Sequence, residues 1–238
     1  MTRAYWQVSR APRYSLLFAL PLLIFYQILA VAVPPGPGGI GLRNGADVIL
    51  ETLLGPWIVM ICIVAVGVWL IAKDLRSHAG RLSVAVFGAM LIESVCLAFA
   101  FGIVVGGLTA ALLGTPPPAL LIPLQTERLG RWTIVMLSIG AGIYEELLFR
   151  VLIVGSLAWG ARRLLGWRPV VAGVAATVVG ALVFSAFHYI GPYGDPLDTY
   201  SFVFRTIAGL FFSGLYLLRG FGITAWTHAL YDVFLLLR

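Results

Sequence analysis

At the centre of the sequence stands Tyr144-Glu145-Glu146-Leu147-Leu148-Phe149-Arg150, inside an otherwise apolar segment that runs from about Trp132 to about Trp159. A charged side chain near the middle of a membrane helix costs about 2.5–3.5 kcal/mol on insertion scales. Two carboxylates and a guanidinium so close together therefore need partners inside a helix bundle, or a functional reason to be there.

Helical spacing separates the roles of the two glutamates. Glu146 and Arg150 are four residues apart, so they can form an ion pair along one stripe of a helix. Glu145 is rotated by about 100° from Glu146, which leaves it available for acid–base chemistry. The alternative is that all three charges only hold helices together, and this stretch alone does not distinguish the two interpretations.

The composition indicates a membrane protein. Of the 238 residues, 61% are hydrophobic and 11% are charged, whereas about 25% of the residues in a soluble domain are charged. The net charge of +6 does not predict nucleic-acid binding, because the basic residues stand singly or in short groups between apolar runs. We expect an all-α, polytopic transmembrane helix bundle in the lipid bilayer, with 1–238 as a single integral membrane domain.

The order of apolar and basic segments predicts the topology. The basic residues fall on alternate loops, which predicts a multi-pass protein of the cell membrane with a cytoplasmic N-terminus. The first apolar run also resembles a signal peptide with a cleavage site near Ala30-Val31-Ala32, but it is longer than a usual h-region, and we favour an uncleaved span. The predicted spans lie at about 15–33, 53–72, from 82 onward, 132–159, 169–190, 201–218 and 221–237.

Three further features of the sequence concern charges outside the central stretch. Residues 46–54 predict a short interfacial helix with Asp47 and Glu51 on its polar side. Glu93 lies in the middle of the third span, and we expect it to be half of a buried ion pair rather than a secondary part of a site. Arg219 is interpreted as the marker of a cytoplasmic turn.

The last three predicted spans carry His188, His228 and Asp232. His228 and Asp232 are four residues apart, so the carboxylate can hold the orientation and tautomer of the imidazole. Each group alone is most simply structural. Together with the central charged stretch, however, these polar groups can be accommodated in the membrane at low free-energy cost only if all of them face one shared, hydrated cavity.

Such a cavity supports two kinds of chemistry. A set of two histidines and carboxylates fits Zn²⁺ in kind, although no His-Glu-x-x-His helix is present. In the metal-free alternative, Glu145 deprotonates a water molecule with help from His188, and His228 donates to the oxyanion of the tetrahedral intermediate.

These residues resemble the CPBP family of intramembrane glutamic proteases, which includes CAAX prenyl endopeptidases and bacteriocin-processing, Abi-like proteins. The resemblance implies an eight-helix-type membrane fold, whereas the sequence itself predicts about seven spans, so we expect about seven to eight. It also implies a catalytic core at 131–238 and no cofactor or metal. Glu146 and Arg150 stand at the family's supporting positions. The motifs that carry the resemblance are Glu145-Glu146-Leu147-Leu148-Phe149-Arg150, Phe184-Ser185-Ala186-Phe187-His188 and His228-Ala229-Leu230-Tyr231-Asp232.

The resemblance also implies roles for individual residues. By motif position, Glu145 and His188 activate water, and His228 forms the oxyanion site together with Asp232. The CAAX enzymes of the family have Asn where this chain has Asp232. An ionised aspartate cannot donate to an oxyanion, so Asp232 would orient His228, or would act only when protonated.

Two functional hypotheses follow. The first is a metal-independent glutamic endopeptidase that hydrolyses a peptide bond near the membrane surface, in a substrate such as a C-terminal tail, a leader or a sorting signal. The alternative is a non-enzymatic membrane scaffold or immunity-like protein whose intramembrane charges are structural. A proton-coupled carrier is disfavoured, because the ionisable groups cluster in one half, whereas carriers usually have paired repeats.

Overall fold

The computed structural model describes residues 3–34, 43–77, 82–114, 129–191 and 194–237. The regular structure within these ranges is helical, which confirms the predicted all-α class. In chain order the elements are α1 (Arg3–Arg10), α2 (Pro12–Ala32), α3 (Gly45–Leu54), α4 (Pro56–Ser77), α5 (Val84–Leu113), α6 (Arg131–Gly140), the π-helix η2 (Ala141–Val154), α7 (Gly155–Leu164), α8 (Pro169–Phe187), α9 (Thr199–Arg219) and α10 (Phe221–Leu236).

Five of the described helices, α2, α4, α5, α8 and α9, are long and apolar enough to cross a membrane, so the chain is a multi-pass membrane protein. The predicted count of seven to eight spans is not confirmed. The segment predicted at 221–237 forms α10, whose 16 residues span about 24 Å, short of a hydrocarbon core of about 30 Å. The segment predicted at 132–159 is divided among α6, η2 and α7, none of which is long enough by itself.

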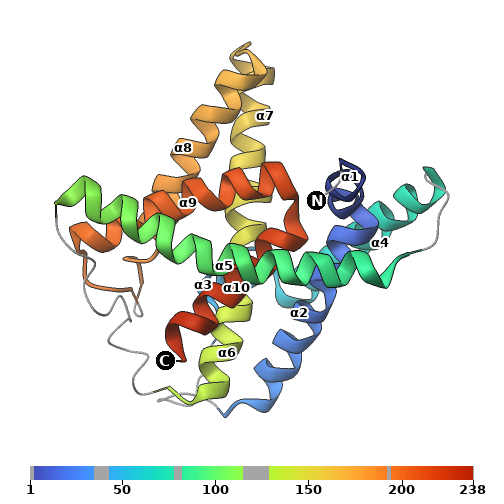
Figure 1. Cartoon of the computed structure of the whole chain (residues 1–238), viewed down its shortest axis with the longest axis horizontal. Helices are drawn as coiled ribbons and strands as arrows, with labels where there is room; N and C mark the ends of the chain where they lie inside the picture. Colours follow the sequence, from blue (N-terminus) through green and yellow to red (C-terminus); the bar gives the residue numbers. More distant parts are fainter. Residues whose placement is uncertain (1–2, 35–42, 78–81, 115–128, 192–193, 238) are drawn as a thin grey trace.

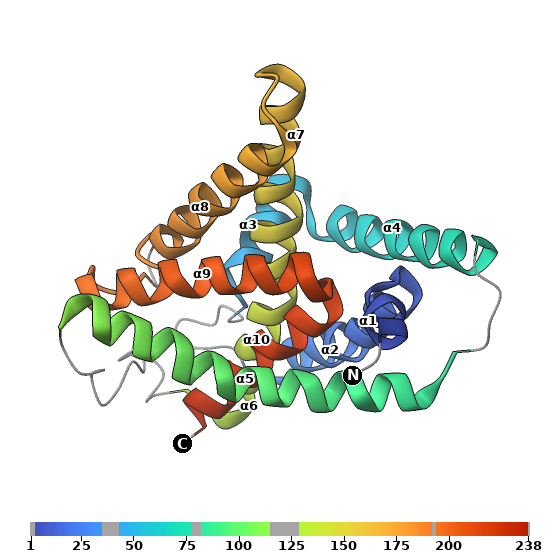
Figure 2. The same ribbon diagram turned by 45° about the horizontal axis from the view of Figure 1, so that its top comes forward.

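Helix α10 lies at the centre of the bundle, where it contacts α2, α5, α6, α9 and η2. Helices α7 and α8 pack against each other and form a hairpin that projects from the rest of the molecule (Figure 1). Helix α4 extends away from the bundle on another side (Figure 2). Because α10 is surrounded by other helices, its polar side chains face protein groups and not lipid.

A glycine permits the close contact between η2 and α10. A Cβ atom on Gly142 would overlap the carbonyl oxygen of Ala225 and would lie 2.8 Å from the Cβ atom of Ala229. Only a residue without a side chain lets the two backbones approach this closely. This packing brings the polar residues of α10 next to the glutamates of η2.

Glu93 is half of a buried ion pair, as predicted. Its two carboxylate oxygens lie 2.6 Å and 2.7 Å from Nε and Nη2 of Arg219, which was interpreted from the sequence only as a turn marker. The same pair is tied to α1, because Tyr5 donates to Glu93 over 2.6 Å and Arg219 donates to Ser9 Oγ over 3.0 Å. A bidentate pair of this kind joins α1, α5 and the end of α9.

The helix predicted at 46–54 is present as α3, and Asp47, which was expected on its polar side, is buried against α2. Its side chain is fully buried, accepts a 2.7 Å hydrogen bond from Tyr26 of α2, and pairs with Arg43 over 2.8 Å. Arg43 also pairs with Glu51 over 2.9 Å. Burial raises the pKa of the Asp47 carboxyl, although Tyr26 and Arg43 oppose that shift. Helix α3 is therefore anchored to α2 through polar contacts.

Candidate active site

The two central glutamates belong to a π-helical stretch. Glu145 and Glu146 lie in η2, between the α-helices α6 and α7, where backbone hydrogen bonding follows the wider i→i+5 pattern. The sequence predicted an ordinary α-helix here, and no residue in the stretch indicates the change. π-Helical segments are rare in proteins and are found frequently at functional sites.

Glu146 forms the predicted ion pair with Arg150 inside the protein. Oε2 of Glu146 lies 3.1 Å from Nε of Arg150, and the two side chains are 0% and 1% exposed. The guanidinium carbon of Arg150 also lies 4.4 Å from the centre of the Phe184 ring and 5.5 Å from that of Phe212. Aromatic ring faces thus lie around a cation that is paired with the Glu146 carboxylate.

The imidazole of His228 lies between two carboxylates. Its Nδ1 is 2.7 Å from Oε1 of Glu146, and its Nε2 is 3.7 Å from Oδ2 of Asp232. One face of the ring stacks on Phe212, with 4.3 Å between ring centres. The sequence predicted only Asp232 as the group that orients His228, but the shorter contact comes from Glu146, which bridges His228 and Arg150.

His188 follows the last residue of α8, and its tautomer is set by the backbone. Nδ1 lies 2.9 Å from the carbonyl oxygen of Phe184, which can only accept, so Nδ1 carries a hydrogen. Nε2 is then directed at Oε2 of Glu145, at 4.0 Å. That distance is too long for a direct hydrogen bond. The side chain of His188 is 24% exposed, compared with 8% for Glu145, so His188 stands at the more open side of the site.

The segment after His188 is held by polar contacts. The backbone N–H of Asp195 donates to the carbonyl oxygen of His188 over 2.9 Å. The carboxylate of Asp195 pairs with Nη2 of Arg205, on α9, at 2.5 Å. These contacts connect the end of α8 to α9 and limit the movement of the His188 backbone.

The carboxylate of Glu145 has two different surroundings. Oε1 accepts a 2.9 Å hydrogen bond from Nδ2 of Asn44, which lies just before α3. Oε2 is buried and has no hydrogen-bond partner within the described part of the chain. Asn44 was missed by the sequence analysis, because a single Asn at the end of a Pro/Gly-rich stretch has no spacing that relates it to a residue on another helix.

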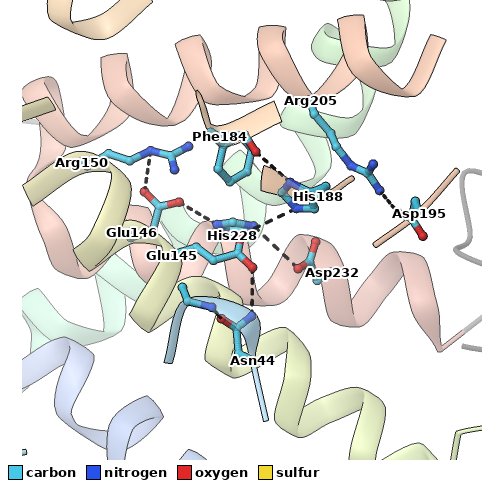
Figure 3. Close-up of polar contacts among 11 residues, drawn as sticks. Asn44, Glu145, Glu146, Arg150, Phe184, His188, Asp195, Arg205, His228 and Asp232 are labelled. Atoms are coloured by element: carbon cyan, nitrogen blue, oxygen red, sulfur yellow. Dashed lines mark hydrogen bonds and ion pairs between the residues drawn. The ribbon is translucent and has the colours of Figure 1, made fainter. Parts of the chain in front are cut away.

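The polar residues predicted as one site do lie together (Figure 3). They come from η2, from the end of α8 and from the middle of α10, and Asn44 reaches them from the start of α3. Within the described ranges, no three side chains of the His, Cys, Asp and Glu types are placed so that they could hold a metal ion together. The set brought together comprises Glu145, Glu146, Arg150, His188, His228 and Asp232.

Comparison with protein families finds a match for the part of the chain that contains these groups. Residues 127–234 match the family described as type II CAAX prenyl endopeptidase Rce1-like. This part of the chain is similar to the Rce1-like family. No curated protein and no solved structure matches the chain. The Rce1-like segment confirms the predicted family of CAAX-type membrane proteases, and it includes every predicted site residue but not Asn44.

Proposed function

We propose that this chain is a metal-independent glutamic endopeptidase that hydrolyses a peptide bond near the membrane surface. The supporting observation is that the buried Oε2 of Glu145, which has no hydrogen-bond partner within the described residues, lies 4.0 Å from Nε2 of His188. The substrate is a membrane-anchored or membrane-proximal peptide, such as a C-terminal tail, a leader or a sorting signal. In this proposal 1–238 form one membrane domain with a cytoplasmic N-terminus, and 131–238 form the catalytic core.

The two atoms suit a water molecule that is about to act as a nucleophile. Hydrogen bonds of about 2.8 Å to each of them are compatible with their separation. Because the His188 hydrogen is on Nδ1, Nε2 and the carboxylate both accept, and both water hydrogens point at the protein. A lone pair of the water oxygen then points away from both acceptors, towards a substrate carbonyl.

In the proposed reaction, Glu145 accepts a proton from water and later donates it to the leaving amine. The water oxygen bonds to the carbonyl carbon while Glu145 takes a proton as general base. When the C–N bond of the tetrahedral intermediate breaks, Glu145 returns that proton to the leaving amine. The products are a carboxylic acid and an amine, and no further reactant is needed.

The oxyanion of the intermediate is stabilised by His228. Nδ1 of His228 already donates to Glu146, so Nε2 carries a hydrogen only when the ring is an imidazolium. Carboxylates on both sides, Glu146 at 2.7 Å and Asp232 at 3.7 Å, favour that positive charge. Nε2–H then donates to the oxyanion. In this mechanism Asp232 supplies negative charge to His228 and does not itself donate.

Asp232→Asn tests this role of the Asp232 carboxylate. The change keeps the size of the side chain and removes one negative charge beside His228. Without the neighbouring carboxylate, the pKa of His228 falls, and the imidazolium deprotonates at a lower pH. We therefore expect the basic limb of the pH–kcat profile to move to lower pH by about 1 unit. An unchanged or faster profile would instead indicate that a protonated Asp232 acts as a donor, which Asn replaces.

The proposed function is tested by cleavage with purified protein in liposomes. A library of membrane-proximal peptides is incubated with wild-type protein and with the Glu145→Gln variant, each with and without a strong chelator. We expect cleavage by the wild type that is unaffected by the chelator. Cleavage that stops with the chelator and returns with Zn²⁺ would make His188 and His228 metal ligands, and folded protein that cleaves nothing would favour a scaffold.

A further inference from the structure

One contact to Glu145 comes from outside the Rce1-like segment. Nδ2 of Asn44 donates to Oε1 of Glu145 over 2.9 Å. Asn44 is 7% exposed and Glu145 is 6% exposed, so the bond is shielded from solvent. In a buried setting, a hydrogen bond donated to a carboxylate is stronger than the same bond at a surface.

The orientation of the Asn44 amide is determined by its other contacts. Oδ1 accepts from the backbone N–H of Ala46 over 2.9 Å, which makes Asn44 the N-cap of α3. Because the oxygen is used by the cap, the NH₂ group must be the end that faces Glu145. The cap and the contact to Glu145 are therefore two separate functions of one side chain.

The backbone of Asn44 is held as firmly as its side chain. Its N–H donates to the hydroxyl of Tyr26 over 3.2 Å, and that hydroxyl donates to Asp47 over 2.7 Å. Gly140 allows this close packing, since a Cβ atom there would lie 2.7 Å from Cβ of Asn44 and 2.6 Å from the ring of Tyr26. Asn44 thus presents its donor to Glu145 from a rigid surrounding.

We propose that Asn44 is a positioning residue of the peptidase, which holds Oε1 of Glu145 so that Oε2 stays ionised and directed at His188. This inference rests on the proposed function. The terminal torsion of a glutamate is soft, and a donor on one oxygen determines where the other oxygen points. Asn44 acts through Glu145 and does not contact the reacting atoms.

Asn44 is a neutral donor in a highly charged neighbourhood, so replacing it changes the state of Glu145 without removing a charge. On the α3 side, Arg43 and Asp47 are paired with each other at 2.8 Å. The charged or titratable groups that face Glu145 from η2, from the end of α8 and from α10 are Glu146, Arg150, His188, His228 and Asp232.

Asn44→Asp is the sharpest test, because it preserves size and the helix cap but replaces the donor with an acceptor. Asp caps a helix as well as Asn does. The second carboxylate makes Glu145 retain a proton at higher pH, and a protonated Glu145 is no longer a base. We expect kcat to fall about 10- to 100-fold with little change in KM, and the acidic limb of the pH–kcat profile to move up by about 1 to 2 units.

Two further variants separate positioning from capping. Asn44→Ser keeps the cap and removes the amide donor, so it is expected to lower kcat and to move the acidic limb in the same direction by a smaller amount. Asp198→Ser is the matched control, because Asp198 caps α9 from an exposed position by accepting from Ser201 over 2.8 Å. This control is expected to leave the pH–kcat profile unchanged.

The outcomes distinguish this inference from the proposed function. If the wild type cleaves, Glu145→Gln does not, and Asn44→Asp has the wild-type kcat and acidic limb, Asn44 is only a helix cap. If no protein cleaves, the proposed function fails, but Asn44 is still tested by infrared titration of the carboxyl band that is lost in Glu145→Gln. A band that titrates at the same pH in wild type and Asn44→Asp would overturn the inference.

Discussion

Replacing Glu145 with glutamine is expected to lower kcat by about 10³- to 10⁴-fold. The amide has the shape of the carboxyl group but cannot take a proton from water. The Gln oxygen can still accept from Nδ2 of Asn44, which donates to Oε1 over 2.9 Å in the native protein, so the site should keep its packing. The measurement is kcat for a peptide cleaved by the wild type, together with the melting temperature of both proteins.

Glu51→Gln is the matched control for this experiment. It makes the same chemical change on α3, where Glu51 pairs with Arg43 and is 21% exposed, and it is expected to retain nearly all activity. A Glu145→Gln protein that cleaves at the wild-type rate would exclude Glu145 as the general base. Loss of activity with a matching loss of folded protein would point to a structural role instead.

Replacing Arg150 with alanine is expected to lower the free energy of unfolding by about 3–5 kcal/mol. The reason is that Glu146, which is 0% exposed, loses the cation 3.1 Å away and is left with His228 alone of its two partners described above, and removing one member of a buried ion pair is costly. The contact with the Phe184 ring at 4.4 Å is lost as well. We expect a lower melting temperature and a lower yield than for Glu145→Gln, measured in the same detergent.

Two companion variants identify the cause of that loss. Arg162→Ala removes an exposed arginine from α7 and should change stability by less than about 0.5 kcal/mol. Arg150→Lys should recover part of the loss, because it keeps the charge but not the planar guanidinium that stacks on rings. Equal melting temperatures for Arg150→Ala and Glu145→Gln would contradict the separation of structural and acid–base roles between the two glutamates.

It was predictable that the polar residues of the site lie together, because a charged side chain inside a membrane has a high free-energy cost unless it has a partner. Glu145, Arg150, His188 and His228 lie on apolar segments, and facing one another is the cheapest way to satisfy them. The i, i+4 spacing of Glu146 and Arg150 correctly predicted their ion pair. Local spacing and the insertion cost were sufficient for these conclusions.

Partners that depend on three-dimensional packing were not predictable. Nothing in the sequence relates Asn44 to Glu145, 101 residues later, or relates Arg219 to Glu93. The π-helical conformation of η2 also leaves no pattern in the residues. Hydropathy also does not show that α10 is short and enclosed by other helices, and the predicted count of spans is not confirmed.

The ion pair between Glu93 and Arg219 has a consequence for biosynthesis. Glu146 is paired with Arg150 in its own helix. Glu93, in contrast, pairs with Arg219, which is synthesised 126 residues later. At about 5–20 residues per second, translation leaves Glu93 without that partner for roughly 6–25 s. During this interval α5 has to be held by the insertion machinery or stay near the interface, and the ribosome must complete α9 before the helix can settle.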